Sequence, residues 1–367
     1  MINKLVIENL KHRPARTLLS VLAIGVEVTL VLTLVGLSHG MLDDFEKRSR
    51  GVGADVIIRP PGSSVFSMST APMSDKLVPF FASQPNVAQA IGVITHTLPG
   101  LFGSVTGIDL ASFNTMSGGF RFLEGGPFRK DDDVIVDEYY ARQGKHQVGK
   151  WIELANRKWQ ICGIVESGKM SRLFVQLPVL QDLSGNKGKL SQIYLRVNGR
   201  ANVDPLVKQL RETPSLKDYQ IYSLEEFTSL ISINNVPWLT PFIRVIVGIA
   251  VIVGFIVVFL SMYTAVLERT REIGILKSLG ASPALIVNLL ARETTLLAIL
   301  GSGAGIGFSY GTRWLIQTLV PASLQQAIVY EWWPIAAGIA VAGALVGALY
   351  PGFKAARQDA IQALAYE

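Results

Sequence analysis

Four long apolar runs constrain this 367-residue chain more than any other feature. They lie between Arg16 and Asp43, from 245 to 267, between Glu293 and Arg313, and from 332 to 353. A helix needs about 20 apolar residues to cross the hydrocarbon core of a bilayer. Hydrophobic residues make up 49% of the chain and charged residues only 17%, which is few for a globular surface. The chain is therefore predicted to be an α-helical integral membrane protein with four transmembrane helices.

Basic residues give the orientation of these spans. They cluster before the first span, between the second and third, and after the fourth: Lys4, Lys11, Arg13, Arg16, Arg269, Arg271, Lys277, Lys354 and Arg357. By the positive-inside rule these three regions, and with them both termini, face the cytoplasm, which leaves roughly 200 residues between spans one and two exoplasmic. The net charge of +6 fits this topology and requires no nucleic-acid partner.

The spans divide the chain into segments. We expect a cytoplasmic interfacial helix at 1–15, spans at 16–42, 241–267, 283–313 and 332–353, an exoplasmic domain at 43–238, a cytoplasmic coupling helix at 268–282, an exoplasmic loop at 314–331 and a cytoplasmic tail at 354–367. In the first segment Ile2, Leu5, Val6 and Leu10 share one helical face, which is typical of a helix lying on the membrane surface.

The exoplasmic segment is predicted to be an α+β domain. Alternating and β-branched stretches favour β-α-β units at about 52–99 and 190–223, separated by a β-rich insertion at about 100–185. A helical stalk at about 224–240 leads into the second span. The only cysteine, Cys162, permits no intramolecular disulfide, so this domain must be held together by its core alone.

The connection between the second and third spans is short and heavily charged. Ile273, Leu276 and Leu279 recur at helical spacing, so it is predicted to be an amphipathic helix. Its candidate functional residues are Glu268, Arg269, Arg271, Glu272, Lys277 and Gly280, the last of which suits a helix C-terminus. A charged helix held between two spans is suited to contact a partner outside the bilayer.

Ionisable residues near the spans have two interpretations. Arg244, Arg292 and Glu293 lie close enough to span ends for their side chains to reach the interface. Glu27 lies within an otherwise uncharged span, where a carboxylate is costly. Either it accepts hydrogen bonds from the second or third span, or it lines a substrate or coupling pathway, and the sequence leaves both open.

No catalytic or metal site is predicted. Gly144, Gly149 and Lys150 have the spacing of a phosphate-binding loop, but Trp151 replaces the Ser or Thr that would bind Mg²⁺. The four histidines are scattered without metal-ligand spacing. The chain is therefore not expected to be an enzyme, nor to bind a cofactor directly.

Three segments resemble the FtsX/MacB-type ABC transporter permeases, also called type VII or mechanotransmission permeases. They are ENL at 8–10 with Pro14 and RTLLS at 16–20, ERTREIGILKSLGA at 268–281, and YPGFKAARQDAIQAL at 350–364, in which Ala360 stands where the family commonly has proline. The order of one span, a large exoplasmic domain and three further spans is similar as well, so the resemblance covers essentially the whole chain.

The resemblance implies partners and a mechanism. It implies a second permease copy, in a homodimer or a heterodimer, on a dimer of cytoplasmic ABC ATPases that binds ATP and Mg²⁺ as separate polypeptides. ATP-driven closure of these ATPases would push the helix at 268–281, and the stalk would carry the motion to the exoplasmic domain. Of the six residues named above, the five charged ones are expected to contact the ATPase, and Gly280, with Ala281, is expected to permit a tight turn.

The same resemblance implies a location in the bacterial inner membrane and leaves three functions open. Export or extraction of an amphiphilic substrate (lipid, lipoprotein, peptide, drug or haem-like molecule) leads, with a periplasmic adaptor and an outer-membrane channel as further partners. Mechanical regulation of a cell-wall hydrolase and sensing of envelope-active peptides are the alternatives.

Overall fold

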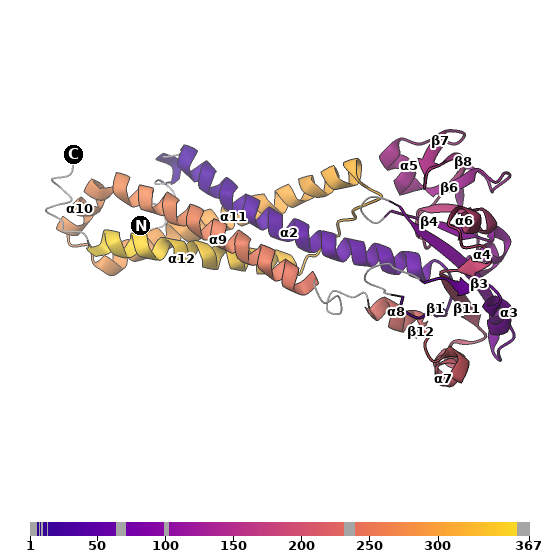
Figure 1. Cartoon of the computed structure of the whole chain (residues 1–367). Helices are drawn as coiled ribbons and strands as arrows, with labels where there is room; N and C mark the ends of the chain where they lie inside the picture. Colours follow the sequence, from indigo (N-terminus) through magenta and orange to yellow (C-terminus); the bar gives the residue numbers. More distant parts are fainter. Residues whose placement is uncertain are drawn as a thin grey trace. The chain divides into compact units, whose positions relative to one another are not determined.

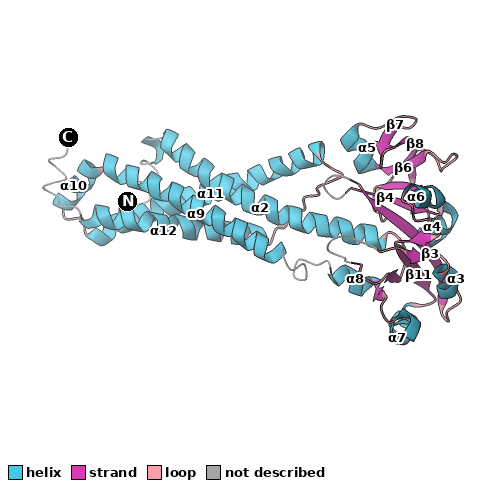
Figure 2. Cartoon of the chain, in the orientation of Figure 1, coloured by secondary structure: helices cyan, strands magenta, loops and turns pink. Residues whose placement is uncertain are grey.

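The computed structural model describes residues 6, 8, 10–12, 14–63, 71–98, 103–230 and 239–357. It divides into two compact units. The first, called the helical unit, comprises Met1–His39, Trp238–Leu315 and Gln326–Glu367. The second, called the α/β unit, comprises Gly40–Pro237 and Ile316–Gln325. All strands of the described residues belong to the α/β unit (Figures 1 and 2).

Within the described residues, four helices are long and apolar enough to cross a membrane. They are α2 (Pro14–Arg50), α9 (Leu239–Glu268), α11 (Pro283–Leu319) and α12 (Trp332–Arg357). A short helix, α10 (Thr270–Ser278), joins α9 to α11. The predicted fold class, four transmembrane helices with a large α+β domain between the first two, is confirmed. Since α2 is continuous as far as Arg50, its residues belong to both units.

Glycines bring α11 close to α2. A Cβ atom added at Gly301 would lie 2.7 Å from the Cβ of Ile24, and one added at Gly305 would lie 2.6 Å from the carbonyl oxygen of Gly25. The hydroxyl of Thr29 donates to the carbonyl of Gly305 at 3.1 Å. Small residues allow this approach of two backbones, which is a main source of helix association in a bilayer.

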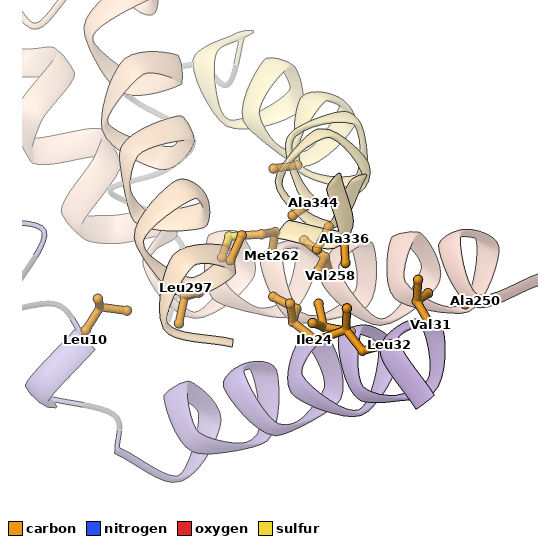
Figure 3. Close-up of a cluster of buried hydrophobic side chains, with 14 of the residues drawn as sticks. Leu10, Ile24, Val31, Leu32, Ala250, Val258, Met262, Leu297, Ala336 and Ala344 are labelled. Atoms are coloured by element: carbon orange, nitrogen blue, oxygen red, sulfur yellow. The ribbon is translucent and has the colours of Figure 1, made fainter. Parts of the chain in front are cut away.

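The core of the helical unit is an apolar cluster with side chains from all four long helices (Figure 3). Ile24 and Val28 of α2 contribute to it, as do Met262 of α9 and the alanines of α12. Val6 and Leu10 are buried in this cluster, whereas Glu8 and Lys11 are exposed. Ile2 and Leu5, which were expected on the same face, lie outside the described residues.

The α/β unit is built on a ten-stranded sheet of order β12-β1-β11-β3-β4-β9-β6-β8-β5, in which β7 also pairs with β8. Its strands are β1 (Val56–Arg59), β3 (Val87–Thr97), β4 (Ser104–Ile108), β5 (Phe122–Gly125), β6 (Asp133–Asp137), β7 (Trp151–Leu154), β8 (Arg157–Val165), β9 (Leu173–Gln176), β11 (Gln192–Val197) and β12 (Gln220–Ser223). β2 (Met73–Ser74) and β10 (Lys189–Leu190) form a separate pair. The helices are α3 (Leu77–Ala82), α4 (Leu110–Ser117), α5 (Glu138–Gly144), α6 (Leu177–Leu183), α7 (Val203–Glu212) and α8 (Leu224–Leu230).

The long strand β3 joins the two parts of this sheet. Its first residues pair with β11 up to Val93, and its last residues pair with β4 from Ile94 onward, antiparallel in both cases. The β-rich stretch expected at about 100–185 therefore continues the sheet of the flanking units. Of the stalk expected at about 224–240, α8 ends at Leu230 and α9 begins at Leu239; residues 231–238, like 358–367 of the tail, lie outside the described residues.

The α2–α11 contact gives a testable prediction. We expect Gly305→Ala to destabilise the protein by about 1–3 kcal/mol, because the added methyl group meets a backbone carbonyl that cannot move without shifting α2. Gly303→Ala is the matched control, since nothing lies within 4 Å of its added Cβ while the gain in helix propensity is the same. Thermal unfolding of both variants in detergent checks this; equal transition temperatures would contradict it.

Candidate coupling site

The short helix α10 has a well-defined end at Gly280. The φ angle of Gly280 is +92°, a left-handed conformation that strongly favours glycine. Its N–H and that of the following residue donate to the carbonyls of Lys277 and Leu276, which is the hydrogen-bond pattern of a Schellman motif. The hydroxyl of Ser282 then accepts a hydrogen bond from the N–H of Leu285 at 3.3 Å and caps α11. The sequence thus fixes where α10 ends and where the third span begins.

One face of α10 is buried against the long helices. Ile273 is 7% exposed and belongs to a small cluster with Val266 of α9, Leu290 of α11 and Ala355 of α12. The ammonium group of Lys277 donates to the carbonyl of Ala356 at 2.9 Å, close to the C-terminal end of α12. Carbonyl groups at a helix C-terminus attract cations, so this contact holds α10 to the fourth span.

A buried carboxylate joins α10 to α2 and α11. Glu293 of α11 is fully buried, and its carboxylate lies 3.1 Å from a guanidinium nitrogen of Arg16 and 3.1 Å from one of Arg269. Arg16 also lies 3.6 Å from the carboxylate of Glu268. We call these four residues the Glu293 network. The network contains two positive and two negative side chains, so its net charge is zero.

The network depends on all of its members. A buried charge loses the solvation of water and is tolerated only when partners of opposite charge compensate for that loss. Arg16 lies in the first turn of α2, Arg269 directly precedes α10, and Glu293 lies in α11. The network thereby holds α2, which is distant in the sequence, in one arrangement with α10 and α11.

The opposite face of α10 is exposed. Arg271 and Glu272 are exposed, and neither side chain forms a hydrogen bond or an ion pair within the described part of the chain. Two apolar side chains lie beyond them, Ile275 at 45% exposure and Leu279 at 79%. We call these four residues the α10 surface. It combines charge with accessible apolar area, as protein interfaces do.

The structure therefore separates the six residues singled out from the sequence. Glu268, Arg269 and Lys277 make contacts within the helical unit, Gly280 ends the helix, and only Arg271 and Glu272 present unengaged charges. The expectation that Glu293 reaches the interface is wrong. Its side chain is short and buried, and two guanidinium groups compensate for its charge. The sequence analysis placed Arg16 in a basic cluster and Glu293 at a span end and did not recognise them as partners, although an acidic residue within an apolar helix was a usable signal.

The C-terminal part of α2 is held by a second set of charges, in the α/β unit. Arg172 donates to Asp137 at 2.7 Å and to Asp44 of α2 at 3.0 Å. Arg48, one turn further along α2, pairs with Asp44 at 2.9 Å. We call these four residues the Arg172 network. It ties the end of α2 to the strand-rich part of the α/β unit.

Asp137 extends this network into α5. It is 1% exposed, and its carboxylate accepts a hydrogen bond from the N–H of Tyr140 as the N-cap of α5. Burial raises the pKa of the Asp137 carboxyl, whereas the neighbouring Arg172 lowers it. At the other end of α5 the side chain of Gln143 accepts a hydrogen bond from the N–H of Ala322 at 2.9 Å. α5 is thus linked to the end of α2 through Asp137 and Arg172, and its Gln143 contacts the segment that follows α11.

Glu27 lies apart from both networks. It is partly buried on α2, and its carboxylate lies against Gly254 of α9. Among the described residues no donor lies within hydrogen-bond distance of it, so neither the second nor the third span supplies the hydrogen bonds that were one interpretation of this residue.

Four spanning helices with an α/β unit inserted after the first form the architecture of a multi-pass membrane permease. Residues 17–213 match the family model described as "MacB-like periplasmic core domain", and residues 244–360 match "FtsX-like permease C-terminal". The first of these alone covers more than half of the chain. The chain therefore belongs to the FtsX/MacB-type ABC transporter permeases, as the resemblance predicted.

Individual relatives agree with this family. The chain is 25% identical over 399 residues to "Macrolide export ATP-binding/permease protein MacB" of Escherichia coli, covering 99% of this chain and 60% of that protein. It is 29% identical over 229 residues to "Uncharacterized ABC transporter permease YknZ" of Bacillus subtilis (strain 168), covering 60% and 55%. The chain thus spans about 60% of the length of the curated relatives that it matches.

A solved structure with a similar fold is the periplasmic region of MacB from Actinobacillus actinomycetemcomitans. Its TM-score is 0.37 at 13% sequence identity, and the match covers 50% of this chain and 94% of that one.

The Glu293 network gives a second prediction. We expect Glu293→Gln to lower the free energy of unfolding by about 3–5 kcal/mol, because it leaves two largely buried guanidinium groups without their shared carboxylate. Glu272→Gln removes an exposed carboxylate from the neighbouring helix and should change stability by less than about 0.5 kcal/mol. Chemical denaturation of both variants in detergent measures the difference. Equal effects would show that the network does not hold these helices together.

The Arg172 network predicts a pH dependence. In Arg172→Gln the buried Asp137 carboxylate loses its compensating charge, so its folded-state pKa, already raised by burial, should rise further. A carboxyl whose pKa is higher in the folded state than in the unfolded state destabilises the folded state increasingly as the pH rises. The variant should therefore lose about 3–5 kcal/mol near pH 7 and visibly less near pH 5, because protonation of Asp137 toward lower pH removes the uncompensated charge.

Urea denaturation at both pH values measures this loss. The control is Arg142→Gln, which removes a guanidinium that is 59% exposed from an ion pair on α5. It should change stability by less than about 1 kcal/mol at either pH. A loss in Arg172→Gln that is the same at both pH values would contradict the role given to Asp137.

Proposed function

We propose that this chain is the permease subunit of an ABC transporter in which a separate cytoplasmic ATPase dimer binds the α10 surface. ATP and Mg²⁺ bind to that partner, and its closure displaces α10. The displacement reaches the exoplasmic side of the membrane, where an amphiphilic substrate is exported or extracted. In this proposal α10 faces the cytoplasm, as the distribution of basic residues predicts.

The observation that carries this proposal is the division of α10 into two faces. Its buried face is held to α2, α11 and α12 through the Glu293 network, Ile273 and Lys277. Its exposed face carries the unengaged charges of Arg271 and Glu272 beside accessible apolar side chains. A partner that binds the exposed face can therefore move the helices without having to break their packing.

Transmission in this proposal uses α2 as well as the stalk above α9. Arg16, near the first turn of α2, belongs to the Glu293 network, and Asp44, near its end, belongs to the Arg172 network. The helix between them is continuous. A displacement of α10 would thus reach α5 and the strand-rich part of the α/β unit through α2.

The proposed assembly contains a second permease copy and, for an export function, a periplasmic adaptor and an outer-membrane channel. One relative is named for macrolide export, which favours export over hydrolase regulation or peptide sensing. No observation on the described residues favours either of those alternatives. A location in the bacterial inner membrane with both termini in the cytoplasm completes the proposal.

Charge reversal on the α10 surface tests the coupling. The double variant Arg271→Glu, Glu272→Arg should remain folded, since both side chains are exposed, but should lose the permease-dependent ATP hydrolysis of the reconstituted complex and its export activity. Reversed charges at an interface cost several kcal/mol, so a loss of at least tenfold is expected.

The control reverses an exposed ion pair of the α/β unit, Arg121→Glu with Glu166→Arg, which should change neither property. A variant of the α10 surface that still assembles with the ATPase and keeps full coupled activity would refute the role of this surface.

A further inference from the structure

The third span ends in the α/β unit. α11 begins in the helical unit, but its last residues and the segment that follows them, Ile316–Gln325, belong to the α/β unit. Among the described helices only α2 and α11 have residues in both units. α11 is therefore a second element, besides α2, that continues from one unit into the other.

The segment after α11 is rigidly connected to that helix. The N–H of Val320 donates to the carbonyl of Ile316 at 2.9 Å. The N–H groups of Ser323 and Leu324 then donate to the carbonyl of Val320 at 3.1 and 3.0 Å. The intervening Pro321 is buried and has a fixed φ angle. Because backbone hydrogen bonds continue from the helix into this turn, the turn moves with the end of α11.

A glutamine of α5 holds this turn. The amide oxygen of Gln143 accepts a hydrogen bond from the N–H of Ala322 at 2.9 Å, and its amide nitrogen lies 3.5 Å from the hydroxyl oxygen of Ser323. Glutamine can make both contacts at once because its amide group has an acceptor and a donor side by side. We call these two contacts the Gln143 clasp. It joins the C-terminal end of α5 to the end of the third span.

The other end of α5 is linked to α2. Asp137, the N-cap of α5, accepts from Arg172, which also donates to Asp44 of α2. α5 has seven residues, so its two ends are about 10 Å apart. The two helices that continue through both units are thus linked to opposite ends of one short helix. If one shifts by about 2 Å relative to the other, as in known switching transitions, α5 tilts by roughly 10°.

An exposed turn is fastened to α5. After the helix ends, the N–H of His146 donates to the carbonyl of Ala141 at 2.8 Å, and its imidazole stacks on the ring of Tyr140 with the ring centroids 5.3 Å apart. Val148 in this turn and Trp151 directly after it are exposed. A tilt of α5 would therefore move an apolar part of the surface of the α/β unit.

We propose that α5 is a lever that responds to the displacement of α2 relative to α11, and that the Gln143 clasp attaches this lever to α11. With its N-terminal end linked alone, α5 would simply follow α2. With both ends linked, its tilt depends on the difference between the two helices. The inference rests on the proposed function in that ATP-driven motion of α10 supplies the displacement. It adds the third span as a transmitting element and names the surface that moves.

Breaking the clasp tests the proposal. Hydrogen exchange of the peptides that cover 138–151 is measured in the full-length permease assembled with its ATPase, with and without a non-hydrolysable ATP analogue. The analogue should change this exchange in the wild type. Gln143→Ala should reduce the change about fivefold, the factor that corresponds to one hydrogen bond of about 1 kcal/mol. ATP hydrolysis by the complex should be unchanged, because the α10 surface is intact.

Matched variants separate the clasp from other effects. Gln147→Ala removes an exposed glutamine of the same turn, whose side chain forms no hydrogen bond among the described residues, and it should leave the exchange response unchanged. Gln143→Glu keeps an acceptor for the N–H of Ala322 and should keep the response. Thermal unfolding of each variant is measured in parallel and should be the same for all three.

A covalent clasp gives the complementary test. In the double variant Gln143→Cys, Ser323→Cys the response should fall as in Gln143→Ala, and a short bis-maleimide that joins the two introduced thiols should restore it. Burial raises the pKa of the native Cys162 thiol to about 12, so maleimide, which reacts with the thiolate, spares it.

Three results would overturn the lever: no effect of the analogue on the exchange of 138–151 in the wild type, a full response in Gln143→Ala, or a response that cross-linking abolishes. The last would show that the clasp has to open. None of them touches ATP hydrolysis, so the coupling role of the α10 surface would stand. Conversely, if the charge-reversed α10 variant keeps its coupled activity while Gln143→Ala loses the exchange response, the lever stands and the role of the α10 surface is refuted.

Discussion

The Glu293 carboxylate is the interaction on which the arrangement of the helical unit depends. It is fully buried, so it can remain there only if charges of opposite sign reach it. Those charges come from the start of α2 and from the residue before α10. Dispersion forces and glycine contacts can pack apolar helices in several registers, but the position of two guanidinium groups around one carboxylate is far more restrictive. The network therefore specifies which helix faces meet, and it places α10 where its other face is open to a partner.

The continuity of α2 follows from the hydrocarbon environment of a membrane span. A backbone in the hydrocarbon region must satisfy its hydrogen bonds internally, so a span cannot be interrupted without cost. α2 extends this regular structure over 37 residues, about 55 Å at the helical rise. One end carries an arginine that contacts two carboxylates of the helical unit, and the other carries an aspartate that accepts from two arginines. In the proposed mechanism these ionic ends make the helix a transmission element, since each end is fixed to what it would move.

Much of this structure could be predicted from the sequence, because the relevant signals are local. Apolar runs reveal the spans, the alternation in 192–197 predicts β11, and Gly280 predicts the end of α10. The networks could not be predicted, because their members lie far apart. Arg16 and Glu293 are 277 positions apart. The sequence around either residue contains no feature that indicates the other as its partner. For the same reason the charges around α10 could not be divided into engaged and exposed sets. That division depends on which face of α10 packs against the other helices. The spacing of apolar residues in such a short segment does not determine which face this is.

Among the described residues, Glu27 differs from the other carboxylates near the spans because no positive charge compensates for it. Wherever a carboxylate is deeply buried near these helices, arginines from other elements surround it and the local charge is balanced. At Glu27 the neighbouring helix contributes a glycine, which provides space but no positive charge. Space without compensation is a poor solution for stability, because the same room would accommodate an apolar side chain at lower cost.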